Sequence, residues 1–257
     1  MYISNYIHLK STELISAGFQ NAKNEILWYL DHNNIISKKD FILMKSDPIS
    51  ENIKSAIDTF FYQRQQSIPF QYILNQCNFY GKNFIIDNRA LIPRPETETV
   101  IRFLSNQKQS LDILEIGTGS GAISCVLSLN KIGKNILATD ICSNALELAQ
   151  ENINYHNIKN IKLIQHDILN QSFNQKFDLI IANPPYISLE AYNKLDLEIK
   201  NYEPQHALTD YQDGLIFYRR FSNIVKDLLK PNGEFYCEIG LSKTCKYIES
   251  IFNKNII

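Results

Sequence analysis

From Leu111 onward, short apolar runs alternate with segments whose apolar residues recur at helical spacing. This alternation is typical of βαβ units and predicts an α/β domain built on a parallel, doubly wound sheet. The expected strands cover residues 111–116, 136–139, 161–165, 177–182 and 234–239. The helices expected between them cover residues 122–129, 143–154 and 215–229.

Polar residues stand at the carboxyl ends of the first four of these strands. Glu115 and Gly117 mark the end of the first strand, Asp140 that of the second, Asp167 that of the third and Asn183 that of the fourth. In open parallel sheets, ligands bind outside the carboxyl ends of the strands, where the strand order reverses. We therefore expect these residues to share one ligand site.

The turn after the first strand is rich in glycine. Residues 115–121 read Glu-Ile-Gly-Thr-Gly-Ser-Gly, and a dinucleotide-binding fold would place the third glycine one residue later. This spacing, preceded by the acid Glu115, favours S-adenosylmethionine: the turn and helix start can receive its carboxylate, and an acid can help to hold its ammonium group. The cofactor-binding residues expected in the turn are Gly117, Thr118, Gly119, Ser120 and Gly121.

The acids after the next two strands suit the rest of that cofactor. Asp140 is expected to accept hydrogen bonds from the ribose hydroxyls. Asp167 is expected to accept from the adenine amino group, and Ile168 to pack on the adenine face. Taken alone, each acid is equally compatible with a helix cap or a solvated carboxylate. Their joint placement at strand ends favours the cofactor.

The fourth strand ends in an unusual tip, Asn183-Pro184-Pro185-Tyr186. The prolines supply no N–H, so the carbonyls of Asn183 and Pro184 are free to accept hydrogen bonds from outside the sheet. The Asn183 amide adds a further acceptor, and Tyr186 adds a flat ring. Such a tip can hold a planar –NH₂ group, and it resembles the signature of methyltransferases that act on amino groups of planar systems. An ordinary turn is the simpler alternative.

Composition limits the other possibilities. The 257 residues carry a net charge of −1, so no bulk positive field favours nucleic acid. The five cysteines form no Cys-x-x-Cys pair, and the histidines show no metal-ligand spacing with them. The first residues lack the pattern of a signal peptide, and no apolar run approaches membrane-spanning length. We expect a cytoplasmic protein with reduced thiols, no metal and no membrane contact.

Three regions are expected along the chain. Residues 1–70 predict a small helical bundle, with Ser37 and Ser50 as helix caps and Arg64 at an exposed helix end. This pattern is compatible with a partner-binding module or with a lid. Residues 71–90 predict a β-hairpin connector with strands near 71–74 and 84–86. Residues 91–257 form the α/β domain.

With these motifs in hand, the chain resembles the protein-(glutamine-N5) methyltransferases that modify peptide chain release factors, the HemK/PrmC family. The run Ile-Pro-Arg-Pro-Glu-Thr-Glu at 92–98 is the most family-specific match, whereas many methyltransferases share the glycine turn. The matching segments are 71–74, 91–98, 117–122, 183–187, 202–204, 213–215 and 218–220.

The resemblance implies methyl transfer to the side-chain amide nitrogen of the glutamine in the release factor's Gly-Gly-Gln motif. Asn183, Pro184 and Tyr186 would be catalytic, and the substrate glutamine would lie against Asn183, Pro184, Pro185 and Tyr186. Asn183 Oδ1 and the Pro184 carbonyl would accept the two amide hydrogens while Tyr186 packs on the amide plane. Asn183 would also touch the cofactor, and the helical domain at 1–70 would bind the release factor as substrate protein. No general base is evident.

The chain also departs from the family. Asn75 stands where glycine is usual, Glu115 replaces the commoner aspartate, and residues 210–212 replace a more glycine-rich stretch. The chain ends at Ile257, where family members continue into a C-terminal strand pair, so we expect a shortened C-terminus.

Other functions remain open at this point. An adenine-N6 methyltransferase acting on nucleic acid would use the same tip but would need a basic groove or a target-recognition domain. A glutamine methyltransferase acting on a ribosomal protein is a second alternative. A third is a non-enzymatic protein that binds cofactor or release factor. A nicotinamide oxidoreductase fits least, because of the glycine spacing.

Overall fold

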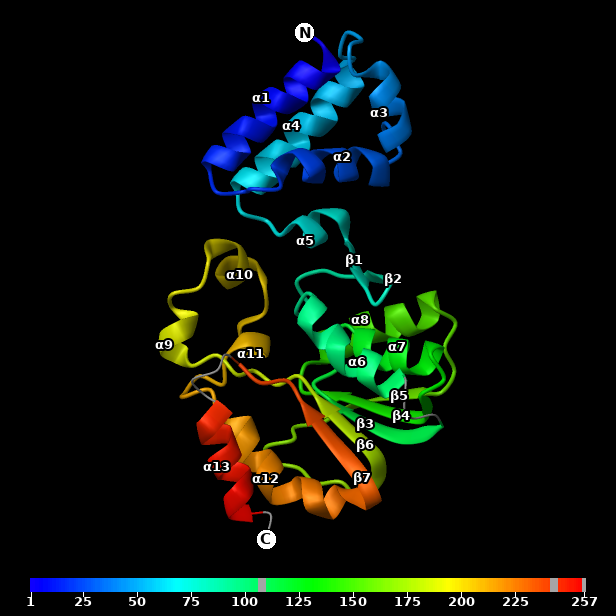
Figure 1. The fold of residues 1–257 in the computed structure, drawn as a ribbon, viewed down its shortest axis with the longest axis vertical. Coiled ribbons are helices and arrows are strands. Elements are labelled where there is room, and N and C mark those ends of the chain that lie inside the picture. Colours follow the sequence, from blue (N-terminus) through cyan, green and yellow to red (C-terminus); the bar gives the residue numbers. More distant parts are fainter. Residues whose placement is uncertain (106–109, 241–244, 256–257) are drawn as a thin grey trace. The chain divides into compact units, whose positions relative to one another are not determined.

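The computed structural model describes residues 1–105, 110–240 and 245–255. The chain divides into two compact units, Met1–Asn75 and Gln76–Ile257 (Figure 1). The division falls within the segment 71–90 that was expected to connect a helical domain to the α/β domain.

The first unit is entirely helical in its regular structure. Ser50 caps its longest helix by accepting a hydrogen bond from the N–H of Ile53, and Ser37 accepts in the same way from Asp40. Both caps match the sequence prediction, because a side-chain oxygen satisfies an N–H that has no partner within the helix. The core is made of apolar side chains from the first, second and fourth helices. The helices are α1 (Ile3–Ser16), α2 (Ala22–His32), α3 (Lys38–Met44), α4 (Glu51–Gln65) and α5 (Phe70–Leu74).

The prediction that Arg64 lies at an exposed helix end is wrong. Arg64 is 3% exposed, and its Nε donates to Glu25 Oε2 over 2.9 Å. Its guanidinium also lies 4.2 Å from the centre of the Phe19 ring. Burial of this cation is possible because Glu25 supplies the opposite charge inside the same core.

The predicted strand at residues 71–74 is also wrong, because this segment forms the short helix α5. Pro69 precedes the helix with an extended backbone, and Asn75 ends it in the left-handed conformation with φ of 50°. Asparagine tolerates this conformation better than most residues, so it can stand where the related family usually has glycine. The hairpin lies a few residues later, as β1 (Gln76–Phe79) and β2 (Lys82–Ile85) joined by Tyr80-Gly81.

The second unit is built on a five-stranded parallel sheet in the order β5-β4-β3-β6-β7. This confirms the predicted fold class, and three strands agree with their predicted bounds. The last strand starts at Leu229 and ends at Cys237, earlier than predicted, because Leu229 already pairs with Phe177 directly after the preceding helix. The strands are β3 (Leu111–Ile116), β4 (Gly133–Asp140), β5 (Ile161–Gln165), β6 (Phe177–Ala182) and β7 (Leu229–Cys237).

Helices cover both faces of this sheet (Figure 1). On one face, α12 and α13 pack through Phe221 and Phe252 against a cluster that includes Leu114 and Ile180. On the other face lie α6, α7 and α8. The helical elements of this unit are the 3₁₀ turn η1 (Pro95–Thr97), α6 (Glu98–Ser105), α7 (Ala122–Leu129), α8 (Ser143–Tyr155), α9 (Leu189–Tyr192), α10 (Leu197–Tyr202), α11 (Gln205–Leu208), α12 (Ile216–Leu228) and α13 (Cys245–Asn255).

The strand order reverses between β3 and β6. Their register pairs Ile116 with Ala182, so the segments that follow the two strands start side by side at the carboxyl edge of the sheet. These segments are the glycine-rich turn and the Asn-Pro-Pro-Tyr tip. The topology therefore brings together two motifs that lie far apart in the sequence.

Candidate active site

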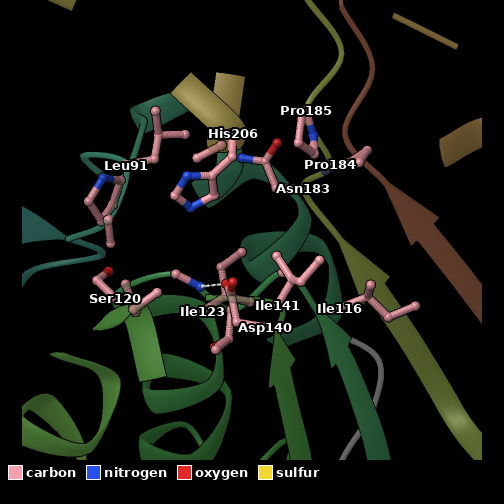
Figure 2. A pocket seen from close by; sticks show the side chains of 18 of the residues that line it. Leu91, Ile116, Ser120, Ile123, Asp140, Ile141, Asn183, Pro184, Pro185 and His206 are labelled. Atoms are coloured by element: carbon pink, nitrogen blue, oxygen red, sulfur yellow. Dashed lines mark hydrogen bonds between the residues drawn. The ribbon is translucent and has the colours of Figure 1, made fainter. Parts of the chain in front are cut away.

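A cavity opens at this edge of the sheet (Figure 2). It is lined by the glycine turn after β3, the end of β4, the loop after β5 and the tip after β6. Gly121 and Tyr186 are the two predicted site residues that do not line it. The predicted residues that line it are Gly117, Thr118, Gly119, Ser120, Asp140, Asp167, Ile168, Asn183, Pro184 and Pro185.

Gly121 has a structural reason to be glycine although it lies outside the cavity. It precedes α7 with φ of +78°, a conformation that side chains other than glycine rarely adopt. A Cβ at this position would lie 3.0 Å from the Cβ of Ala149 on α8. The glycine therefore permits both the turn and the close approach of two helices.

Asp140 connects the end of β4 to the glycine turn. Its Oδ2 accepts a hydrogen bond from the N–H of Gly119 over 2.9 Å, drawn as a dashed line in Figure 2. Its Oδ1 accepts from the N–H of Cys142, also over 2.9 Å. Each carboxylate oxygen can accept a further hydrogen bond, so the side chain can hold the turn and still bind ligand hydroxyls.

Glu115 does not reach the cavity, contrary to the idea that it helps to hold an ammonium group there. It is 1% exposed, and its Oε2 accepts hydrogen bonds from the Thr118 hydroxyl and from the N–H and hydroxyl of Ser124. Burial raises its pKa to about 7, although the bonds from Ser124 and Thr118 oppose this shift. Its Oε1 has no partner among the described residues. Glu115 therefore stabilises the glycine turn from the protein interior, through the hydrogen bonds that it accepts from Thr118 and Ser124.

The loop after β5 presents Asp167 and Ile168 to the cavity. Asp167 Oδ1 accepts from the N–H of Leu169, and Oδ2 accepts from the Asn170 side chain, so this carboxylate also shapes its own turn. Arg220 of α12 holds the loop from outside, with 2.8 Å between Nε and the Ile168 carbonyl oxygen and 2.8 Å between Nη2 and the Gln171 carbonyl oxygen.

His166 stands beside this loop and lines the same cavity. Its ring stacks on Phe173 with 4.0 Å between the ring centres. Burial lowers the pKa of the imidazole, Asp167 opposes that shift, and Arg220 adds to it. The Nε2 atom is buried and has no hydrogen-bond partner in the part of the chain that the structure describes.

The tip presents Asn183, Pro184 and Pro185 to the cavity (Figure 2). Tyr186 is not among the residues that line it. The Tyr186 hydroxyl donates to Glu238 Oε1 over 3.2 Å. Burial, followed by the nearby Glu238 carboxylate, raises the Tyr186 pKa to about 12. Tyr186 therefore anchors the tip through its hydroxyl, and the packing of its ring on a substrate amide stays a prediction.

Several lining residues were not singled out from the sequence. Leu91 and His206 line the cavity together with Asn183 (Figure 2). Arg94 also lines the cavity, and its Nη2 donates over 2.6 Å to Glu203, a carboxylate with a side chain only 2% exposed. The signal for Leu91 and Arg94 was present, because both belong to the family-specific run at 91–98. His206 lies in a short helix that carries no motif.

Two features are absent from the described residues: a group of metal ligands and a helix that could span a membrane. These residues contain no group of three or more His, Cys, Asp or Glu side chains arranged to hold a metal ion. Among residues 1–105, 110–240 and 245–255, no helix combines the length and apolar character that crossing a bilayer requires.

Comparisons with known proteins agree with this geometry. Residues 95–199 match the family model described as Methyltransferase small domain. The release factor glutamine methyltransferase of Streptococcus pneumoniae is 36% identical over 247 residues, which cover 95% of this chain and 87% of that protein. The release factor glutamine methyltransferase of Bacillus subtilis is 33% identical over 239 residues, covering 90% and 82% respectively.

Among solved structures, a methyltransferase from Pyrococcus furiosus superposes with a TM-score of 0.51. The superposition covers 68% of this chain and 79% of that chain, at 20% identity. This likeness shows a shared fold.

Proposed function

Because the chain belongs to the family of release factor glutamine methyltransferases, we propose that it methylates the side-chain amide nitrogen, N5, of the glutamine in the Gly-Gly-Gln motif of peptide chain release factors. The observation that carries this proposal is the pairing of Ile116 with Ala182, which sets the glycine turn beside the Asn-Pro-Pro-Tyr tip. A methyl donor held by the turn and an amide held by the tip would meet at this edge of the sheet.

The cavity suits S-adenosylmethionine as the methyl donor. In the glycine turn, the N–H groups of Gly117 and Thr118 donate to the Thr139 carbonyl and that of Gly119 donates to Asp140, which leaves the N–H of Ser120 for a ligand. Asp140 offers carboxylate oxygens, and Ile141 and Ile168 offer apolar surface. These groups match the carboxylate, the ribose hydroxyls and the adenine face of that cofactor. Asp167 would accept from the adenine amino group. When bound, the cofactor supplies an electrophilic methyl group on a sulfonium.

The tip would orient the substrate amide. Asn183 Oδ1 and the Pro184 carbonyl would accept the two amide hydrogens, since the prolines bring no N–H that would compete for them. The nitrogen lone pair would then point toward the methyl group, and both acceptors would favour the positive charge that develops on nitrogen. Positioning would be the main contribution of these residues, because an amide nitrogen is a weak nucleophile.

The first unit, Met1–Asn75, would recognise the body of the release factor. It has a core of its own, and the short helix α3 exposes Ile42 and Leu43, by 66% and 73%. Residues 1–70 would then serve as a substrate-binding domain, the hairpin within 71–90 as the connector and 91–257 as the catalytic domain. The reaction would take place in the cytoplasm, where release factors act and where free thiols such as the five found here stay reduced.

Methyl incorporation tests the proposal directly. Labelled S-adenosylmethionine is incubated with a release factor whose Gly-Gly-Gln glutamine is intact and with one in which it is alanine. Label that depends on the glutamine is the expected result. Absence of label in a protein that still binds the cofactor would contradict the proposed substrate and turn attention to a nucleic-acid or ribosomal-protein substrate.

Asn183→Ala tests the role of the tip in the same assay. We expect turnover to fall by about a hundredfold, because one of the two acceptors of the amide hydrogens is lost. Asn193→Ala removes an exposed asparagine just after α9 and serves as the matched control. Near wild-type turnover in folded Asn183→Ala protein would remove Asn183 from the mechanism.

A further inference from the structure

Glu238, the residue that directly follows β7, is bonded to both ends of the tip. Its backbone N–H donates to the carbonyl oxygen of Ala182 over 2.9 Å, immediately before Asn183. Its side-chain Oε1 accepts from the Tyr186 hydroxyl over 3.2 Å, at the other end of the motif. One residue therefore spans the segment Asn183–Pro185 that faces the cavity.

Glu238 is itself held from two directions. Its Oε2 accepts from the hydroxyl of Thr97 over 2.5 Å, and Thr97 is a buried residue that lines the cavity. Its carbonyl oxygen accepts from the hydroxyl of the buried Tyr218 over 3.0 Å. The carboxylate thus connects the run at 92–98 to the tip, two family-specific segments that are distant in the sequence.

The last residue of the tip is enclosed as well as bonded. A Cβ at Gly240 would lie 3.1 Å from Cδ2 of the Tyr186 ring. A Cβ at Gly214, which has φ of +80°, would collide with the Tyr186 carbonyl. Because Gly214 and Gly240 lack a Cβ, Tyr186 has room in the position that it occupies. The Tyr186 hydroxyl is protonated at neutral pH and can donate to Glu238, since burial raises its pKa to about 12 from a value already well above 7.

We propose that Glu238 is a positioning residue for methyl transfer, acting through the Tyr186 hydroxyl to hold Asn183 and Pro184 in their working geometry. The inference rests on the proposed function. Pro184 and Pro185 cannot donate hydrogen bonds to neighbouring strands, so the tip depends on contacts at its two ends. A shift of about 1 Å at a reacting group can cost on the order of a hundredfold in rate.

A double-mutant cycle separates this role from general support of the fold. Glu238→Ala, Tyr186→Phe and the double variant are compared with the wild type for kcat, for KM of the release factor and for Kd of S-adenosylmethionine. We expect each single change to lower kcat roughly tenfold to a hundredfold. The double variant should have about the same kcat as the less active of the two single variants, because both changes break the same bond. The Kd should stay within about twofold, since Glu238 does not line the cavity.

Conservative and matched variants complete the test. Glu238→Gln should recover part of the kcat, because its amide oxygen can still accept from one hydroxyl. Tyr236→Phe is the control: its hydroxyl donates to Glu234 over 2.7 Å on the same strand, and neither residue lines the cavity. This control should keep the wild-type kcat.

The outcomes distinguish the inference from the function on which it rests. Wild-type methylation of the release factor together with unchanged kcat in Glu238→Ala, or with fully additive losses in the cycle, overturns the inference alone. Absence of wild-type methylation overturns both. If Glu238→Ala does not fold, Tyr186→Phe decides the matter, since it keeps the ring and removes only the hydroxyl; an unchanged kcat in that variant overturns the inference.

Discussion

The Oδ2 atom of Asp140 lies 2.9 Å from the backbone nitrogen of Gly119 and accepts its N–H. This bond links the end of β4 to the glycine turn that follows β3. The carboxylate that would bind ribose hydroxyls therefore also sets the shape of the turn that would receive the methionine end of the cofactor. The Asp140 side chain would therefore contact the ribose directly and would also shape the site for the methionine end.

Asp140→Ala should consequently weaken cofactor binding more than the loss of a single contact would. We expect the Kd of S-adenosylmethionine to rise by about tenfold to a hundredfold, because charge-assisted hydrogen bonds contribute about 1.5–3 kcal/mol each. Isothermal titration calorimetry measures the change. Asp112→Ala, an acid on β3 whose partners Asn135 and Lys230 lie away from the cavity, is the control. An equal Kd in the two variants would exclude Asp140 from the cofactor site.

Gly121 and Gly81 form a matched pair for testing helix packing. Both have positive φ, +78° and +70°, so alanine at either position is strained in the same way. Only Gly121 meets a neighbour, since nothing lies within 4 Å of a Cβ built at Gly81. Gly121→Ala should lower the free energy of unfolding by about 1–3 kcal/mol more than Gly81→Ala does. Urea denaturation measures both, and equal losses would contradict the close approach of α7 and α8.

The sheet and its ligand edge could be predicted because they follow from local patterns. Residues 177–182 form an almost continuous apolar run, interrupted only by Asp178, which in a parallel sheet marks a strand covered on both faces. Once such strands alternate with helices, their carboxyl ends must meet at one edge, so Asp140 and Asn183 were expected near each other. The prediction needed only spacing and the topology of βαβ units.

Features that depend on long-range partners could not be predicted in this way. Arg64 looked like a solvated helix end, yet Glu25, 39 residues earlier, makes its burial possible. Tyr186 was expected to pack on a substrate amide, and its sequence neighbours do not indicate that Glu238, 52 residues later, binds its hydroxyl. A periodic pattern identifies which residues face a core, but it does not identify the partner that a polar side chain meets there.

Arg220 and Arg219 offer a comparison between adjacent residues of one helix. Arg220 bonds to two carbonyl groups of the loop that carries Asp167 and Ile168, whereas Arg219 pairs with Asp213 at an exposed site. Arg220→Ala leaves those carbonyls without their donors and should loosen the loop. We expect a rise of about tenfold in the Kd of S-adenosylmethionine, in line with two lost hydrogen bonds.

Arg219→Ala should leave that Kd unchanged, because exposed ion pairs contribute little. Isothermal titration calorimetry on Arg220→Ala and Arg219→Ala measures the two Kd values. Similar affinities for Arg220→Ala and Arg219→Ala would mean that the loop holds its shape without the guanidinium.

The buried Glu115 should give the protein a specific dependence of stability on pH. Burial raises its pKa in the folded state from 4.5 to about 7. Below pH 4.5 the group is protonated in both states, and between these values the folded state binds more protons than the unfolded state. The free energy of unfolding contributed by Glu115 therefore falls as the pH rises through about 7, by roughly 3 kcal/mol in total for a shift of this size.

Glu115→Gln removes this titration while keeping an oxygen that can accept from Thr118 and Ser124. We expect the variant to gain stability relative to the wild type as the pH is raised from 5 to 8, with a constant difference above that range. Urea denaturation at several pH values measures the difference. Glu147→Gln, at an exposed position on α8, is the matched control. A pH-independent difference between Glu115→Gln and the wild type would mean that Glu115 is ionised in the folded protein throughout, with its charge compensated beneath the turn.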